Sequence, residues 1–297
     1  MSKSEQTELF PELVQKRCKP VNVASVPFRS PFRYPGGKTW FVPAFREWIR
    51  YLDRKSDLLI EPFAGGGIIS LTAIFERLVD NVLMVELDED IAAVWQVVCE
   101  GGADKLAKRI ITFDLNVTNL KRELSKKPKS LLDMAFQTIL KNRTYHGGIL
   151  AEGSGLMKSG ENGKGITSRW YPKTLSRRIR NIGSLKEKID FIRKDGLHVM
   201  ERYSQKDDVV FFIDPPYTAG GKKAGKRLYK YNEIDHERLF DICSDLSGDF
   251  LMTYDISDEA KSMAMSHNFD MRSIPMKNTH NNKMYELVIA KDLSWMD

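Results

Sequence analysis

Four consecutive residues, Asp214-Pro215-Pro216-Tyr217, place a carboxylate, two prolines and an aromatic ring side by side. They follow the apolar run 209–213, which is typical of a strand buried in a parallel sheet. We therefore expect the tetrad at the carboxyl end of a central strand, where open α/β sheets bind their ligands. This position favours a catalytic role for Asp214, Pro215, Pro216 and Tyr217.

The tetrad suits the transfer of a group to an exocyclic amino group on a planar base. Asp214 and the carbonyl of Pro215 can each accept a hydrogen bond from the NH2, which turns its lone pair out of the ring plane, and the prolines stiffen that geometry. Tyr217 offers a flat face on which an extruded base can stack. The alternative is an ordinary proline-rich turn after a strand, with Tyr217 covering the core.

A second motif, Glu61-Pro62-Phe63-Ala64-Gly65-Gly66-Gly67, lies between an expected strand at 57–60 and an expected helix at 68–78. Strand, glycine-rich turn and helix form the nucleoside-binding layout of doubly wound sheets, and the glycines let a ligand approach the backbone closely. The turn has neither a Walker lysine nor the G-x-G-x-x-G spacing, which disfavours a pyrophosphate ligand.

The next expected strand, 81–85, is followed by Glu86. A carboxylate at this place can accept both hydroxyl protons of a ribose. The glycine turn and Glu86 together point to a nucleoside cofactor such as S-adenosylmethionine. The alternative is a βαβ unit with a tight turn and a solvated acidic loop.

A third motif, Phe32-Arg33-Tyr34-Pro35-Gly36-Gly37-Lys38, is expected to form a loop before the first strand. It leads into 39–52, where apolar residues recur at helical spacing. Lys38 can meet the carboxylate of a methionine moiety, and Tyr34 can pack beside it. By itself the loop is equally well an ordinary turn with a surface lysine.

In this order, the three motifs resemble those of the Dam-type (D12 class, alpha group) DNA adenine-N6 methyltransferases. That family places an aromatic-x-Gly-Gly-Lys loop before the cofactor strand and a long insert before the DPPY tetrad, as this chain does. Residues 141–148 are similar to its Asn-Arg-aromatic-Asn-Gly stretch, with His146 where asparagine is common, and 235–239 resemble its Asp-His-x-x-Leu helix start. The resemblance spans about 31–291.

The resemblance implies a site for the cofactor and a reaction. The residues that it places around S-adenosylmethionine are Tyr34, Gly37, Lys38, Glu61, Phe63, Gly65, Glu86, Asp195 and Asp214. The implied reaction moves a methyl group to N6 of an adenine flipped out of duplex DNA. It needs alignment and charge placement more than a base, and no metal.

Basic residues are unevenly distributed in a chain of formal net charge +6. Nine lysines and arginines stand against two glutamates between 141 and 180, and the loop after the tetrad is lysine-rich. Beside a base-binding tetrad, such stretches favour contact with a phosphate backbone, although a solvated surface is the alternative for each residue. Our candidates for DNA binding are Arg143, Tyr145, Lys158, Arg169, Trp170, Lys222, Lys223, Lys226 and Arg227.

The element pattern predicts an α/β fold, a doubly wound Rossmann-like sheet with an insert. Strands are expected near 57–60, 81–85, 208–213, 248–254, 269–274 and 284–291, and insert helices at 104–111, 120–124 and 131–140. We expect a catalytic domain formed by 27–100 and 187–297, a target-recognition domain at 101–186 with a glycine-rich loop at 147–165, and a loosely ordered extension at 1–26.

Other features limit the setting in which the protein works. Three scattered cysteines favour a reducing cytoplasm without a disulfide framework or zinc knuckle, and no apolar run approaches the length of a membrane span. The partner implied by the resemblance is double-stranded DNA, bound by a monomer or weak dimer, and a companion restriction endonuclease would fit a restriction-modification system.

Three other functions compete with this interpretation. Cytosine-N4 enzymes usually have serine before Pro-Pro, so Asp214 argues against them. RNA adenine or protein glutamine enzymes more often have asparagine there, which disfavours them less strongly. An inactive nucleic-acid-binding protein on the same scaffold is the alternative from another class. The intact set of Lys38, Glu86, Asp214 and Tyr217 speaks against it.

Overall fold

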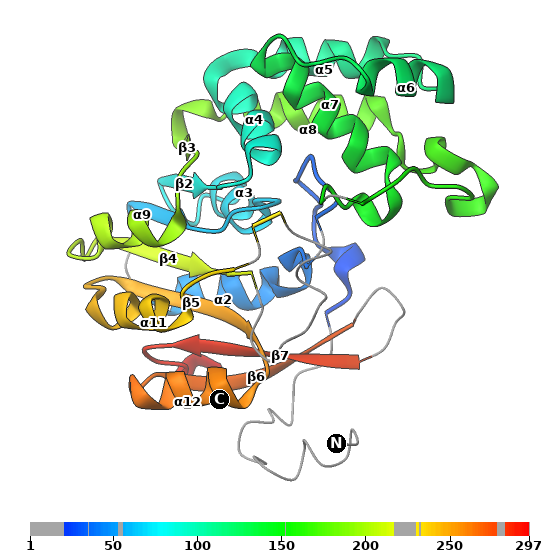
Figure 1. Cartoon of the computed structure of the whole chain (residues 1–297). Coiled ribbons are helices and arrows are strands. Elements are labelled where there is room, and N and C mark those ends of the chain that lie inside the picture. The colour runs from blue at the N-terminus through cyan, green and yellow to red at the C-terminus, as the bar shows by residue number, and fades with distance from the viewer. Residues whose placement is uncertain are drawn as a thin grey trace.

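The structure is a computed structural model, and it describes residues 21–34, 36–52, 56–151, 153–216, 230–231, 233–277 and 283–296. Within them, seven strands form one sheet in the order β3-β2-β1-β4-β5-β7-β6 (Figure 1). The strands are β1 (Leu58–Glu61), β2 (Asn81–Val85), β3 (Ile189–Ile192), β4 (Val209–Ile213), β5 (Asp249–Asp255), β6 (Asp270–Lys277) and β7 (Lys283–Ala290).

Strands β1 to β5 are parallel, whereas β7 is antiparallel to its neighbours β5 and β6. From β1 the chain moves to β2 on one side, and it later returns through β4 on the other side. The carboxyl ends of β1 and β4 therefore flank the topological switch point, where doubly wound sheets bind ligands.

Helices cover both faces of the sheet, because side chains alternate between the faces along each strand. Leu59 and Val210 face one core, and their neighbours Ile60 and Phe211 face the other. The first core lies under α2 (Val42–Tyr51), α3 (Ile68–Phe75) and α4 (Glu89–Val97). The second lies under α9 (Gly196–Tyr203), α11 (His236–Asp245) and α12 (Asp258–Ser266).

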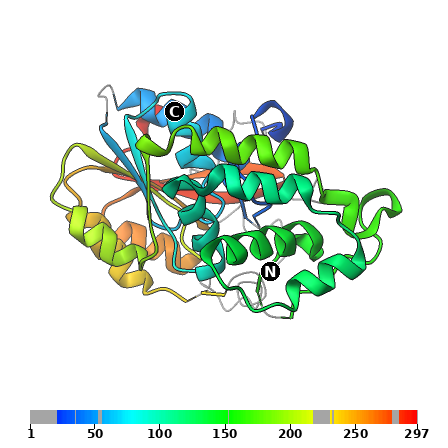
Figure 2. The same cartoon turned by 90° about the horizontal axis from the view of Figure 1, so that it is seen from above.

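A helical insert separates α4 from β3. Its α-helices are α5 (Ala103–Thr112), α6 (Val117–Leu124), α7 (Leu131–Thr144) and α8 (Pro172–Gly183). Seen from above, these helices lie beside the sheet (Figure 2), and α5 contacts both α7 and α8. Their apolar side chains, among them Leu106, Phe136 and Leu175, belong to the same core as α2, α3 and α4. The insert is therefore packed against the part of the chain that forms the sheet.

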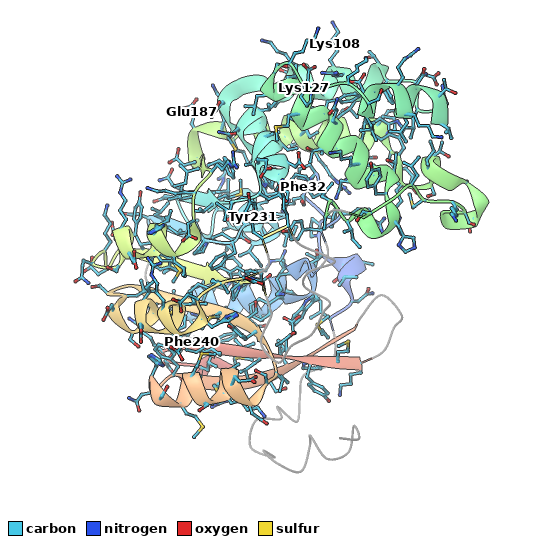
Figure 3. The ribbon with its side chains drawn as sticks, in the orientation of Figure 1. Phe32, Lys108, Lys127, Glu187, Tyr231 and Phe240 are labelled. Atoms are coloured by element: carbon cyan, nitrogen blue, oxygen red, sulfur yellow. The ribbon has the colours of Figure 1, made fainter. Side chains whose placement is uncertain are left out.

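Short helical segments connect these elements. They are η2 (Val23–Ser25), η3 (Lys38–Phe41), η4 (Val98–Gly102), η5 (His146–Gly148), η6 (Glu161–Gly163), η7 (Gly165–Arg169), η8 (Lys186–Lys188) and η9 (Ser294–Met296). The side chain of Phe32 is buried between the insert and the sheet (Figure 3), with its ring centroid 5.6 Å from that of Trp95 on α4.

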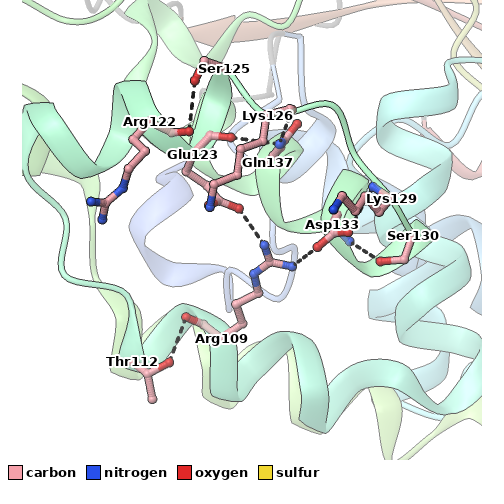
Figure 4. A network of polar contacts seen from close by, with 10 residues as sticks. All are labelled: Arg109, Thr112, Arg122, Glu123, Ser125, Lys126, Lys129, Ser130, Asp133 and Gln137. Atoms are coloured by element: carbon pink, nitrogen blue, oxygen red, sulfur yellow. Dashed lines mark hydrogen bonds and ion pairs between the residues drawn. The ribbon is translucent and has the colours of Figure 1, made fainter.

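One arginine joins three helices of the insert (Figure 4). From α5, Arg109 donates to Asp133 on α7 and to Glu123 on α6, both at 2.6 Å. Its guanidinium also lies 4.4 Å from the ring centroid of Phe136. Gln137 donates to the carbonyls of Glu123 and Lys126, at 2.9 Å each, so the α6–α7 connection is fixed by backbone contacts as well.

The structure confirms the expected α/β fold with a doubly wound, Rossmann-like sheet. All six predicted strands are present, but the edge strand β3 was not predicted. Asp190 is exposed within it, so it does not form an apolar run. The predicted insert helices are confirmed, with α7 continuing to Thr144. In the described ranges, no helix is long and apolar enough to cross a bilayer.

Candidate active site

Acidic side chains gather where the parallel strands end. Glu61 closes β1, Glu86 follows β2, Asp195 follows β3 and Asp214 follows β4. Glu286 of β7 lies at the same edge, because it pairs with Asp255, the last residue of β5. The topology thus brings four predicted acids and one unpredicted acid to the ligand-binding edge of the sheet.

The glycine turn carries the ring of Tyr34 against its backbone. Gly65 has a φ of +46° and Gly67 a φ of +61°, so both occupy a conformation that favours glycine. A Cβ atom on Gly65 would lie 2.6 Å from Cε1 of Tyr34, which shows how closely the ring approaches. Trp95 Nε1 donates to the Gly65 carbonyl at 2.9 Å. Tyr34 and the glycine turn, both predicted to contact the cofactor, are therefore adjacent.

Glu86 is fixed by backbone amides. Its Oε1 accepts from Leu87 and Asp88 at 2.8 and 2.9 Å, and its Oε2 accepts from Gly65 at 3.0 Å. Burial raises the pKa of Glu86 to about 7, although these hydrogen bonds oppose the shift. A carboxylate has about four acceptor positions, so three amide bonds leave it able to accept a hydroxyl.

Glu61 lies beneath the glycine turn and is almost fully buried. Its Oε2 accepts from the backbone N of Ser70 at 3.1 Å and from its hydroxyl at 2.5 Å, which ties β1 to α3. Burial raises the pKa of Glu61 to about 8, and the nearby carboxylates of Asp214 and Glu86 contribute. This placement favours support of the turn over direct contact with a cofactor.

Phe63 and Asp195 are neighbours at the far side of the site. Asp195 caps α9 by accepting from the backbone N of His198 at 3.2 Å. The next residue, Gly196, has the Phe63 ring so close that a Cβ there would lie 2.9 Å from Cε1. Phe63 and Asp195, both predicted to contact the cofactor, are therefore adjacent, although strand β3 before Asp195 was not predicted.

Lys38 is buried and pairs with the carboxylate of the tetrad. Its Nζ lies 2.9 Å from Oδ1 of Asp214 and 3.3 Å from Oε2 of Glu286, and it donates to the Gly36 carbonyl at 3.2 Å. The Thr253 hydroxyl donates to the same Asp214 oxygen at 3.1 Å. The ammonium of Lys38 is thus already surrounded by two carboxylates and a backbone carbonyl. Its predicted contact with a cofactor carboxylate would add a third carboxylate to this ammonium.

Glu286 is the site residue that sequence reasoning did not identify. It is 9% exposed, and its Oε2 makes no hydrogen bond of good geometry within the described residues. Burial raises the pKa of Glu286 to about 7; Lys38 opposes the shift and Asp214 adds to it. The available signal was a lone acid in an apolar strand: Glu286 precedes Leu-Val-Ile-Ala.

Asn142 and Arg143 of the insert form hydrogen bonds with the segment that precedes Lys38. Buried Asn142 accepts from the Arg33 amide at 2.9 Å and donates to the carbonyls of Arg33 and Gly148 at 2.9 and 2.8 Å. Arg143 is 5% exposed and donates to the Pro31 carbonyl. Burial lowers the pKa of Arg143 to about 9, and neighbouring arginines contribute. This position favours an anchoring role over the predicted contact with DNA.

The other insert candidates differ in exposure. Lys158 is exposed, whereas Tyr145, Arg169 and Trp170 are partly buried. Trp170 packs edge-on against Phe113, with ring centroids 6.3 Å apart. It is thus part of the core of the insert, and its contact with DNA stays a prediction, as do those of Tyr145, Lys158 and Arg169.

Part of the predicted site lies outside the described residues. These residues are Tyr217, Lys222, Lys223, Lys226 and Arg227. Just after them, Lys230 pairs with Glu89 at the start of α4, and the Tyr231 hydroxyl donates to Glu89 at 3.3 Å. The chain after the tetrad therefore returns close to Glu86.

Comparison with known proteins identifies a family. The model of the family described as "D12 class N6 adenine-specific DNA methyltransferase" matches residues 34–282. No curated protein matches the chain. Among solved structures, a candidate RNA methyltransferase from Pyrococcus horikoshii is 12% identical with a TM-score of 0.40, over 98% of this chain and 96% of that chain.

Two further solved structures are similar at the same level. A precorrin-6y C5,15-methyltransferase from Geobacter metallireducens is 10% identical with a TM-score of 0.34, over 84% of this chain and 86% of that chain. A candidate methyltransferase from Escherichia coli, yhhF, is 12% identical with a TM-score of 0.36, over 90% and 92%. Resemblances of this size say nothing about the substrate of this chain.

Proposed function

Because the chain belongs to the D12 class N6 adenine-specific DNA methyltransferase family, we propose that it methylates N6 of a flipped-out adenine in duplex DNA. The proposed methyl donor is S-adenosylmethionine. The observation that carries the proposal is the Asp214 carboxylate, which Lys38 and Thr253 fix at the end of β4, directly before Pro215 and Pro216. It supplies an oriented acceptor where an amino group can be held.

The donor set at the sheet edge fits a nucleoside cofactor. Glu86 retains capacity to accept a ribose hydroxyl, since its three amide bonds occupy only part of its lone pairs. Gly65 leaves the backbone of the turn unshielded by a side chain of its own, beside the ring of Tyr34. Phe63 and Asp195 would border the adenine ring of the cofactor. When bound, S-adenosylmethionine supplies a sulfonium methyl group that the N6 lone pair takes as the S–C bond breaks, leaving its electrons on sulfur.

The residues of the chain supply position and charge rather than a strong base. The N6 amino group donates one hydrogen bond to Asp214 and one to the Pro215 carbonyl, which favours a tetrahedral nitrogen with its lone pair directed at the methyl group. The negative charge of Asp214 stabilises the positive charge that develops on N6. One N6 proton is then released to water. A properly placed acceptor is therefore the main requirement.

Duplex DNA requires an extruded base and a basic surface. Extrusion costs a few kcal/mol, which stacking on an aromatic ring such as that of Tyr217 offsets in part. The exposed Lys158 is a candidate for contact with the phosphate backbone, as are the lysines of the loop after the tetrad. Arg143 is left out because of its burial.

Transfer of a labelled methyl group tests the proposal. Purified protein is incubated with tritiated S-adenosylmethionine and either unmethylated duplex DNA or RNA of the same sequence, with Asp214→Asn as the matched variant. We expect label in DNA only, and a loss on the order of a hundredfold or more in the variant. Label in RNA alone would overturn the choice of substrate, and no transfer to either would overturn the activity.

A further inference from the structure

One buried ammonium is shared by two carboxylates that come from distant parts of the chain. Lys38, 3% exposed, lies between Asp214 after β4 and Glu286 in β7. Antiparallel pairing of β7 with β5 puts Glu286 opposite Asp255 and so at the edge where Asp214 lies. Asp214 directly follows β4 and Glu286 belongs to β7, so the sheet fixes the positions of both carboxylates.

The charges of this cluster do not balance when both acids are ionised. A buried cation requires an anionic partner, and Asp214 at 2.9 Å is sufficient for that purpose. Glu286 adds a second negative charge in a place where burial is costly. The groups that face it are Lys38, Asp214 and, across the β5–β7 pair, Asp255, whereas its partner on β6 is the apolar Ile274. Stability alone gives no reason for this second acid.

The proposed reaction does give a reason. If Lys38 paired with Asp214 alone, its positive charge would cancel most of the negative charge of Asp214. That negative charge is needed to stabilise the positive charge that develops on the reacting amine. Sharing the ammonium with Glu286 returns part of that charge to Asp214, while Lys38 and Thr253 still fix Oδ1. As the methyl group is transferred, N6 becomes positive, and a site with net negative charge favours this change.

We propose that Glu286 is a positioning residue for methyl transfer, which acts through Lys38 to hold Asp214 and to leave it a net negative charge. This inference rests on the function proposed above. It also assigns Lys38 to Asp214 rather than to the carboxylate of the cofactor. Neither residue needs to touch the substrate for this role.

Three glutamate variants test the proposal. Glu286→Gln keeps the shape and removes the charge, and Glu286→Asp restores the charge. Glu187→Gln, at an exposed site in η8 directly before β3 (Figure 3), is the matched control. We expect Glu286→Gln to slow single-turnover methyl transfer roughly ten- to a hundredfold, with dissociation constants for cofactor and DNA within about twofold of wild type. Glu286→Asp should recover part of the rate, and Glu187→Gln should equal wild type.

A second measurement does not depend on activity. Mass spectrometry after limited acetylation compares Lys38 with the exposed Lys108 in the same sample. Without the second carboxylate, the Lys38 ammonium loses its proton more readily, so its acetylation relative to Lys108 should rise several-fold in Glu286→Gln and not in Glu187→Gln.

The outcomes separate this inference from the proposed function. An unchanged acetylation ratio, or a Glu286→Gln variant with the wild-type rate, overturns the role of Glu286. Equal losses in Glu286→Gln and Glu286→Asp, accompanied by weaker cofactor binding, also overturn it and indicate a structural role. A wild-type protein that methylates no nucleic acid overturns the proposed function, while a raised acetylation ratio in Glu286→Gln would still support the shared ammonium.

Discussion

Replacing Asn142 by leucine should destabilise the junction between the insert and the loop that carries Lys38. The side chain makes three hydrogen bonds to buried or partly buried backbone groups, at 2.8 to 2.9 Å, and leucine of similar size makes none. Each buried group left unsatisfied costs roughly 1–3 kcal/mol, so we expect a loss of about 3 kcal/mol or more in the free energy of unfolding.

Thermal unfolding followed by circular dichroism measures this effect. For a domain of this size, a loss of about 3 kcal/mol lowers Tm by roughly 6–12 °C. Asn181→Leu, at an exposed position on α8, is the control and should change Tm by little more than about 1 °C. An Asn142→Leu variant with the Tm of wild type would refute the anchoring role of Asn142.

Three further predictions follow from single residues. Arg109→Met should cost about 1–3 kcal/mol and speed hydrogen exchange in α6 and α7, because Glu123 and Asp133 lose their shared partner; unchanged exchange there would contradict this. The raised pKa of Glu61, about 8 against an ordinary 4.5, means that the folded state holds a proton that the unfolded state releases, so the free energy of unfolding should fall as pH rises between these values. Urea unfolding at pH 6 and 9 should show that fall in wild type and a smaller fall in Glu61→Gln, in which Glu86 and Glu286 still titrate; an equal fall in both proteins would contradict this. Glu86→Ala should weaken binding of S-adenosylmethionine about tenfold or more in calorimetry, and an unchanged affinity would remove Glu86 from the site.

Motif order and strand position predicted the framework of the site. Glu86 and Asp214 each follow an apolar strand, and parallel strands bring their carboxyl ends to one edge, so their proximity follows from local pattern and sheet topology. Tyr34 and Gly65 were each expected at the cofactor site from their motifs, and the structure places them side by side. In each case a short motif and the element before it were enough.

Other contacts depend on tertiary placement that the sequence pattern does not contain. The pairing of Lys38 with Glu286 requires β7 to lie antiparallel beside β5, and alternating apolar residues do not distinguish that arrangement from others. Strand β3 was not predicted because the exposed Asp190 interrupts its apolar residues. The positive charge of Arg143 suggested DNA, whereas its burial against the Pro31 carbonyl depends on how α7 docks.

The central claim is that Asp214 directs methyl transfer to adenine N6 in DNA. The most direct test is nucleoside mass spectrometry of unmethylated genomic DNA after incubation with S-adenosylmethionine and either the wild-type protein or Asp214→Ala. We expect a rise in N6-methyladenine with wild type and none with the variant, which should remain folded. Methylation of a different base, no methylated base, or substantial N6-methyladenine from Asp214→Ala would contradict it.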